Sequence, residues 1–426
     1  MRLTAWLPLA VLSALTVCGA ATRPRYGGTL RVEMRATPLA SLVFEPLVRL
    51  DDAGTPQSCL AISWQHDAAA KHWQFTLRPG VKLQDGSPLT AAAVVASLQA
   101  ALPGLTIAAV GDAVISIHAS HPLPDLLLDL AHDGSLATGP FRPTSFDPGQ
   151  RTTFAANEDY WGGRPFLDTI DVQLGRSLRD QLVDLELGKA DIVEVAPTDL
   201  RRASDHGRTI WASAAVSLIA LLFTPGEDPR LREALALSID RAAMHTVLLQ
   251  KQGEVTAALL PQWISGYAFA FSTAPDLPRS HSLANALPPA ARTLTLTYDP
   301  AMRSARSLAE RVAVNARDVG VIVQVSPQNS RAGVRLVEVR LVSPDPAQAL
   351  TGLAAALGLE APGQTESLAA LYESEHKLLE GFRAIPLFQL PVLYGVASRV
   401  RAHGSQPITK LGDWRFDNVW LSGTAP

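Results

Sequence analysis

The chain has 426 residues, of which 47% are hydrophobic and 18% charged, so it is long enough for two or three domains with substantial cores. This composition excludes a disordered chain and a coiled coil. The formal net charge is -3 at pH 7, which leaves no excess of basic residues to attract nucleic acid or anionic lipid. We therefore expect local recognition of a partner and no binding of nucleic acid.

The N-terminus has the three parts of a secretory signal. Arg2 precedes an apolar run over residues 5–17, and small residues follow as far as Ala21. The run is too short to span a bilayer as a helix. We expect a signal peptide over residues 1–21 and a mature protein in the periplasm or on the exterior of the cell envelope. Lipid anchoring at Cys18 and an uncleaved anchor are the alternatives.

Cysteine usage is sparse. The sequence has two cysteines, and removal of the signal leaves Cys59 alone, so the mature chain has no internal disulfide. Small and apolar residues surround Cys59, which predicts a buried free thiol and not a reactive one.

The first third of the chain alternates strands and turns. Residues 28–34 and 73–77 alternate apolar and polar side chains, the pattern of a half-buried strand. Thr90 is a candidate N-cap for a helix over residues 91–101. Residues 114–118 predict a further strand.

The middle of the chain predicts mixed α/β structure. A helix over residues 178–187 followed by a strand over 191–195 forms an αβ unit. A long helix is expected over residues 229–250, with Asp228 and a proline at its start. Residues 268–293 are rich in Ala, Pro and Ser, which indicates a surface connection.

The last third predicts a separate α/β lobe. A strand over residues 293–298, a helix over 301–318 and a strand over 321–325 form a βαβ arrangement. Residues 385–396 are apolar and strand-like. Their distance along the chain does not prevent this strand from pairing back onto the first lobe.

Eight segments resemble, in order, the consensus of the bacterial extracellular solute-binding protein family 5, which serves peptide, nickel and oligosaccharide importers. One such match is weak, but the ordered series is hard to produce by chance. The segments are 27–32 (GGTLRV), 44–50 (FEPLVRL), 77–91 (LRPGVKLQDGSPLTA), 138–141 (TGPF), 157–165 (NEDYWGGRP), 187–192 (LGKADI), 231–241 (LREALALSIDR) and 315–321 (NARDVGV).

The resemblance implies an α/β fold of the periplasmic-binding-protein-like type II. Two α/β lobes are joined by a hinge, and a small domain is inserted in the first lobe. On that template the first lobe takes residues 22–43, 138–255 and 387–426, and the inserted domain takes 44–137. The second lobe, which is shortened, takes 256–386.

The resemblance also implies a function without bond chemistry. A protein of this family is the extracytoplasmic substrate-binding protein of an ABC transporter. It captures a small solute, peptide-like or sugar-like, between its lobes and delivers it to an ABC permease in the membrane. We expect a monomer that is not an enzyme and has no cofactor. The alternative is a degenerate member that acts as an envelope interaction or assembly protein without a small ligand.

The chain departs from the family where a ligand is held. The second lobe is cut down after residue 325, and residues 222–224 (LFT) replace the Asn-Thr that often ends the crossing strand. Residues 339–346 lack the Trp and Asp found in many members, which have acidic groups nearby that receive a peptide's amino terminus. A buried ammonium needs a carboxylate partner, so peptide binding requires a substitute such as Glu338 or Asp345.

Four residues are the candidate ligand contacts: Trp263, Tyr267, Phe223 and Arg340. Trp263 and Tyr267 lie where the chain is expected to cross to the second lobe, and exposed rings there bind sugars or apolar parts of peptides. Packing in the core is the alternative for both rings.

Motifs for catalysis and cofactors are absent from the sequence. It has no Gly-x-Ser-x-Gly elbow, His-Glu-x-x-His helix, phosphate-binding loop or dinucleotide fingerprint. Histidines cluster at His118 and His121, with His132 nearby, but the spacing favours structural or surface histidines over a metal site. We expect no catalytic residue and no metal ligand.

Overall fold

The computed structural model describes residues 23–35, 40–132, 134, 136–302, 304–327, 332–363, 365–404 and 407–423. The predicted signal peptide and Cys18 lie outside these residues. Within them, no helix combines the length and the apolar character that a membrane crossing requires.

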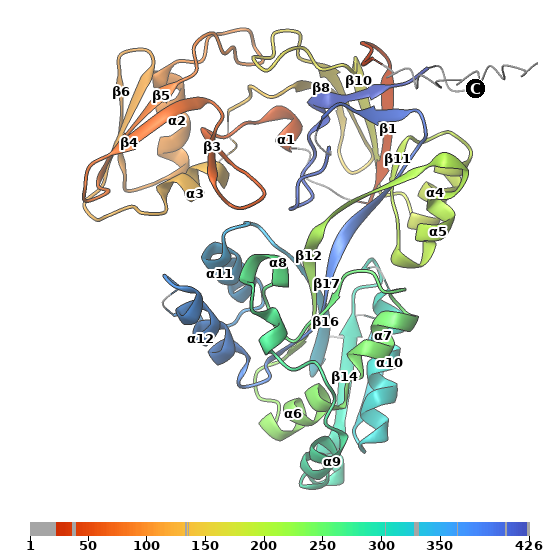
Figure 1. Cartoon of the computed structure of the whole chain (residues 1–426). Coiled ribbons are helices and arrows are strands. Elements are labelled where there is room, and N and C mark those ends of the chain that lie inside the picture. Colours follow the sequence, from red (N-terminus) through yellow and green to blue (C-terminus); the bar gives the residue numbers. More distant parts are fainter. Residues whose placement is uncertain are drawn as a thin grey trace, which may run out of the picture.

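Two long antiparallel strands cross the middle of the molecule and join its two lobes (Figure 1). They are β12 (Thr209–Phe223) and β17 (Ala384–Val396), paired from Thr209 with Val396 to Leu222 with Ala384. Both strands are almost continuously apolar, as expected of strands that are covered on both faces. The pairing is irregular between Ala212 and Ser217, where the register shifts.

The first lobe extends the sheet from the C-terminal end of β17, where β11 pairs with it. Strand β1 pairs in parallel with β10 and β11, and β9 and β8 add antiparallel strands. These elements are β11 (Ile192–Glu194), β1 (Thr29–Met34), β10 (Thr169–Leu174), β9 (Arg151–Ala156) and β8 (Phe141–Asp147), with α1 (Ala40–Val43), α4 (Leu178–Glu186), α5 (Leu200–Ala203) and a closing hairpin of β18 (Val400–Ala402) and β19 (Val419–Leu421).

The second lobe extends the same sheet from the C-terminal half of β12, where β16 pairs with it. Its strands β14 and β15 are parallel and are joined by α10, which confirms the predicted βαβ unit. Helices α11 and α12 lie on one side of the crossing strands, and α7 and α10 on the other (Figure 1). The elements are β13 (Glu254–Val255), β14 (Thr293–Tyr298), β15 (Ile322–Pro327), β16 (Val334–Arg340), α6 (Pro229–Ser238), α7 (Arg241–Val247), α8 (Gln262–Ser265), α9 (Leu277–Asn285), α10 (Ala305–Asp318), α11 (Pro346–Ala356) and α12 (Leu368–Leu379).

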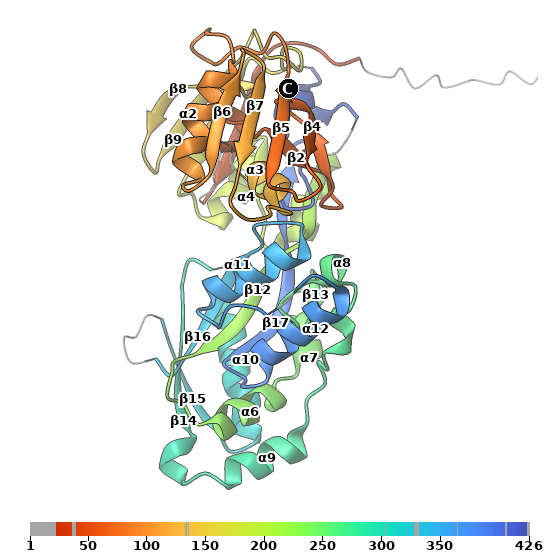
Figure 2. The ribbon, with the colours of Figure 1, turned by 90° about the vertical axis from the view of Figure 1, so that its left-hand side faces the viewer.

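A small domain with its own core is inserted between α1 and β8. Its core includes Trp73, Phe75 and the buried free thiol of Cys59, whose pKa burial raises to about 11. The predicted helix over residues 91–101 is confirmed, and the Thr90 side chain caps it by accepting from the Ala93 amide. Figure 2 shows this domain face on, above the second lobe. Its elements are β2 (Val48–Leu50), β3 (Pro56–Ser58), β4 (Ala61–His66), β5 (His72–Leu77), α2 (Ala91–Ala101), β6 (Thr106–Val110), β7 (Val114–His118) and α3 (Leu126–His132).

One prediction of local structure was wrong. The single helix over residues 229–250 is two helices, because Ile239 is extended and Asp240 caps α7 by accepting from Ala243. Residues 268–293, the predicted surface connection, are mostly exposed and contain α9, which Asp276 caps. Helix α6, which the predicted boundaries assign to the first lobe, packs with α9 and α10 in the core of the second lobe.

The carboxylate of Glu45 joins the inserted domain to the first lobe. It is 1% exposed and accepts hydrogen bonds from Thr138 Oγ1 at 2.9 Å, Tyr160 Oη at 2.9 Å, Trp161 Nε1 at 2.7 Å and Arg49 Nη2 at 2.8 Å. Removing one member of such a buried network leaves the hydrogen-bonding groups of the remaining members without a partner inside the protein. The family motif residues at these positions therefore act together in fixing how the two parts of the chain meet.

We expect Glu45→Gln to lower the free energy of unfolding by about 3 kcal/mol, because the amide nitrogen replaces one acceptor oxygen and so faces two of the four donors. Urea denaturation measures this change. Glu158→Gln is the control, since Glu158 pairs with Arg164 at 2.7 Å on the surface and should change stability little. Equal stability of the two variants would contradict the role of Glu45.

Glu33, near the end of β1, is a second buried carboxyl group in the first lobe. Arg176 Nε lies 3.6 Å from its Oε2, but the same arginine also pairs with Asp184. Burial, followed by the negative charge of Asp184, raises the pKa of Glu33 to about 7. The folded protein therefore holds a proton on Glu33 at a pH where the unfolded chain has lost it.

The stability contributed by protonated Glu33 is complete below its ordinary pKa of about 4.5 and is lost as the pH rises through about 7. We expect Glu33→Gln to be more stable than the unmodified protein at pH 8, by about 1 to 2 kcal/mol, and to lose this advantage at pH 5. Denaturant midpoints at both pH values test this. A difference that does not change with pH would refute it.

Candidate functional site

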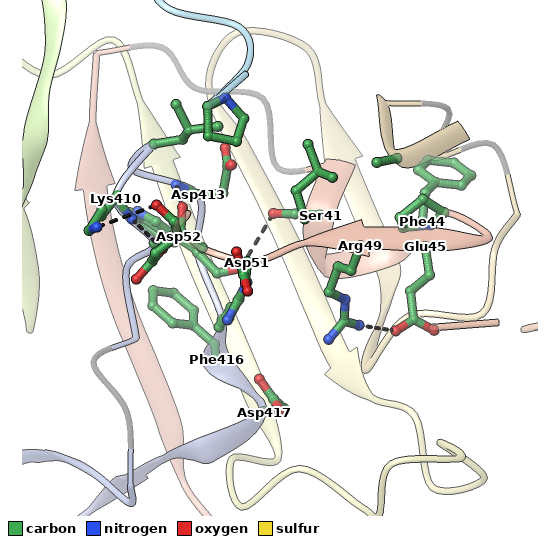
Figure 3. Close-up of a pocket in the computed structure, with 18 of the residues that line it drawn as sticks. Ser41, Phe44, Glu45, Arg49, Asp51, Asp52, Lys410, Asp413, Phe416 and Asp417 are labelled. Atoms are coloured by element: carbon green, nitrogen blue, oxygen red, sulfur yellow. Dashed lines mark hydrogen bonds and ion pairs between the residues drawn. The ribbon is translucent and has the colours of Figure 1, made fainter. Parts of the chain in front are cut away.

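A cavity of about 230 Å³ lies between the lobes. Most of its wall comes from three parts of the chain: the segment of residues 41–52 that enters the inserted domain, a loop near the C-terminus, and the turn after β16 in the second lobe (Figure 3). A solute in this cavity therefore touches both sides of the hinge. Among the residues in its wall are Ser41, Phe44, Glu45, Arg49, Asp51, Asp52, Tyr160, Val342, Pro344, Lys410, Asp413, Trp414, Arg415, Phe416 and Asp417.

The loop of residues 407–417, which we term the C-terminal loop, supplies half of the charged groups in the wall. A bridge between Ile408 and Trp414 closes it, and Gly412 turns the chain with a φ of 84°. Glycine suits this turn because other residues rarely adopt such a φ, and a Cβ here would also lie 2.9 Å from Arg340 Nη2. The buried ring of Trp414 packs edge to face on Tyr394 of β17 with centroids 5.4 Å apart. The crossing strand thus fixes the base of the loop.

Arg340, a predicted ligand contact, holds this loop in place. Its Nη2 donates to the Leu411 carbonyl at 2.6 Å and lies 3.8 Å from Asp413 Oδ1. Arg340 ends β16, opposite Ser217 of β12. It therefore connects the crossing region to the C-terminal loop and is not among the residues that form the wall of the cavity.

Several of the charged groups in the wall are already paired. Glu45 holds Arg49, and the Asp51 carboxylate accepts from the amides of Ala53 and Thr55, which lowers the pKa of Asp51. The Lys410 amide donates to the Asp52 carboxylate at 3.2 Å, and its Nζ donates to the Asp52 main-chain carbonyl at 3.3 Å (Figure 3). The Arg49 and Asp51 side chains thus already have partners, whereas the Lys410 ammonium contacts a main-chain carbonyl and no carboxylate of the described residues.

Two carboxylates of the C-terminal loop are left for a ligand. The side chain of Asp413 is 55% exposed, and its one ionic neighbour is Arg340 at 3.8 Å. Asp417 has neither a hydrogen bond nor an ion pair through its side chain with any residue that the structure describes. Carboxylates in this state are suited to receive an ammonium or guanidinium group.

Two of the other predicted contacts are core residues. Phe223 is 1% exposed in the core of the second lobe, so its prediction as a ligand contact was wrong. Tyr267 is also buried, and its Oη donates to Glu375 Oε2 at 2.7 Å. Phe223 was predicted from its position at the end of the crossing strand, and that position does not show whether the side chain faces the space between the lobes or a core.

Trp263 lies beside Lys410 of the C-terminal loop. Its Nε1 donates to the Ala215 carbonyl at 2.8 Å, and Lys410 Nζ lies 5.6 Å from the ring centroid. Trp263 is thus next to the site, but its ring is not part of the cavity wall. Glu338 and Asp345, the expected substitutes for a carboxylate partner, are also outside the wall, and Asp345 caps α11.

The sequence analysis missed the C-terminal loop. Residues 413–417 (DWRFD) alternate charged and aromatic side chains, a pattern that could have marked a site. Their position near the end of the chain gave no indication that they meet residues 41–52.

One histidine of the cluster noted in the sequence pairs with a histidine outside it. His118 stacks on His72 of the inserted domain with centroids 3.8 Å apart, and both rings lie 3.1 Å from Ser116 Oγ. The described residues include no group of three or more His, Cys, Asp or Glu side chains placed to hold a metal ion.

Known proteins resemble this chain in sequence and fold. The probable D,D-dipeptide-binding periplasmic protein DdpA of Escherichia coli is 25% identical over 249 residues, covering 49% of this chain and 48% of DdpA. The nickel-binding periplasmic protein of Escherichia coli is 26% identical over 248 residues, covering 48% and 47%. The matches thus span about half the length of these relatives.

The likeness in fold covers nearly the whole chain. The periplasmic binding protein DppA of Helicobacter pylori, solved with the peptide STSA, superposes with a TM-score of 0.77 at 16% identity, over 94% of this chain and 99% of that one. This confirms the predicted type II fold of two α/β lobes. The model of the bacterial extracellular solute-binding proteins, family 5 middle region, matches residues 55–114 and 128–352. The chain therefore belongs to the family 5 of bacterial extracellular solute-binding proteins.

Proposed function

We propose that this protein is the extracytoplasmic substrate-binding component of an ABC-type importer. It captures a small peptide-like solute between its lobes, as a monomer in the periplasm, and delivers it to a membrane permease. The observation that carries this proposal is the pair Asp413 and Asp417, two carboxylates without a close cationic partner, in a cavity lined from both sides of the hinge.

The chemistry of the cavity favours a ligand with a free ammonium group. Asp417 offers both oxygens, Arg49 is already paired with Glu45, and Lys410 Nζ donates to the main-chain carbonyl of Asp52. A peptide's amino terminus replaces its lost hydration by charge-assisted hydrogen bonds to such carboxylates. The relatives described as binding a dipeptide and a peptide support the same class.

A sugar-like solute is less well served by this wall. Sugar sites use exposed aromatic platforms, but Trp414 and Phe416 are 4% and 0% exposed, which leaves Phe44, at 38%, as the exposed aromatic ring of the wall. Contacts on both lobes stabilise the closed arrangement over the open one, and only such differential contacts let a ligand shift that equilibrium.

We expect an unmodified dipeptide such as Ala-Ala to bind the mature protein and Asp417→Asn to weaken it about 10- to 100-fold, because a charge-assisted hydrogen bond of about 1.5 to 3 kcal/mol is lost. N-acetyl-Ala-Ala, which has no ammonium, should bind weakly to both forms. Isothermal titration calorimetry measures the affinities.

Asp159→Asn is the matched control, since Asp159 pairs with Lys82 on the surface and is not part of the cavity wall. It should bind like the unmodified protein. Equal binding of the acetylated dipeptide would refute the role of the ammonium. An empty cavity in native mass spectrometry, with no response to peptides and with a protein partner recovered instead, would favour an assembly role without a small ligand.

A further inference from the structure

The second lobe contains a separate cavity of about 190 Å³, bounded by α6, α12 and the start of β17. It has no wall residue in common with the cavity between the lobes. In Figure 1 these elements lie in the lower half of the molecule, on the side of α12. A ligand here would touch the second lobe alone.

The wall of this cavity contains a buried arginine without a carboxylate. Arg241 is 4% exposed, and its Nε donates to the Pro386 carbonyl at 3.0 Å. No ion pair joins its guanidinium to a residue in the described ranges. Asp240 precedes it, but that carboxylate accepts from the Ala243 amide at 2.9 Å as the cap of α7. Burial alone lowers the pKa of Arg241 to about 10.

Nearby charges do not compensate Arg241. Glu380 lies in the same wall, but its side chain is 64% exposed and lies 3.5 Å from His376 Nδ1. Glu375 is buried on the same helix, where its oxygens accept from Leu259, Leu260 and Tyr267. The guanidinium therefore places an uncompensated positive charge in a low-dielectric site. An unpaired buried ion of this kind raises the free energy of the folded state.

The rest of the wall is mainly apolar. It is formed by Ala236, Leu237, Ala257, Phe271, Leu379, Phe382, Ala384 and Ile385. A cavity of roughly 150 Å³ with such a lining holds a benzene-sized molecule. A guanidinium fork matches a carboxylate with two parallel hydrogen bonds. The site therefore combines one anion-binding group with room for a small apolar body.

We propose that this cavity is a second ligand site, for a small monocarboxylate whose carboxylate meets Arg241 and whose apolar body fills the space beside Phe271 and Ile385. The site is independent of the function proposed for the cavity between the lobes. Its occupant supplies the negative charge that Arg241 lacks.

The test uses benzoate as the probe and benzamide as its neutral counterpart, with the mature full-length protein in isothermal titration calorimetry. We expect benzoate to bind at least 10-fold more tightly than benzamide. Arg241→Met should reduce benzoate binding at least 10-fold while its melting temperature without ligand stays equal or rises, because an uncompensated buried charge has been removed. A purely structural arginine would instead give a lower melting temperature.

A second variant keeps the arginine and fills the space. Ala257→Leu narrows the cavity and should also reduce benzoate binding at least 10-fold, even if Arg241→Met fails to fold. Asp413→Asn, in the cavity between the lobes, should leave benzoate binding unchanged. Absence of benzoate binding, or binding that Ala257→Leu does not alter, would overturn the proposal. Inorganic phosphate binding in place of benzoate would overturn the ligand class.

Discussion

The pairing of β12 with β17 is the constraint on which the rest of the molecule depends. These strands carry the sheet from one lobe to the other: β11 of the first lobe adds to the far end of β17, and β16 of the second lobe adds to the far end of β12. Regular pairing is interrupted between Ala212 and Ser217. There the Ser213 hydroxyl accepts from the Val392 amide, and the Ala214 amide donates to the Lys410 carbonyl at 3.0 Å. The irregular stretch is therefore hydrogen-bonded directly to the C-terminal loop.

Carboxylates in this fold are divided between architecture and recognition. The two oxygens of Glu45 accept hydrogen bonds from four donors of the inserted domain and the first lobe. Asp191 does the same for Arg31 and Arg399, which fork onto it with distances of 2.7 to 3.1 Å and join β1 to the C-terminal hairpin. Both belong to the family motifs. The carboxylates with spare acceptors, Asp413 and Asp417, lie outside those motifs, so the family pattern identifies the frame and does not indicate the ligand contacts that we propose.

The second lobe shows the same contrast between buried groups whose partners lie in the protein and a charged group without an ionic partner, which here is a cation. Most of its buried polar groups have protein partners, as Glu375 does through two amides and a tyrosine. Arg241 ends the family motif of residues 231–241, yet beyond one carbonyl its guanidinium faces a cavity. A buried charge in that state raises the free energy of the folded chain unless something outside the chain compensates it. This is a physical reason to treat the second cavity as a site and not as a packing defect.

Local signals in the sequence determined the elements whose ends are set by neighbouring residues. Thr90 and the helix it caps, the strand over residues 114–118 and the βαβ unit of the second lobe follow from capping and periodicity, which act over a few residues. The ordered motifs added the family and with it the two-lobed fold. Only the tertiary structure decided that residues 229–250 break at Ile239, that Phe223 faces a core, and that Arg340 supports a loop some seventy residues later. It also decided that Asp413 and Asp417 meet residues 41–52 across the cavity, because contacts between distant segments depend on how the sheet brings them together and leave no local trace in the sequence.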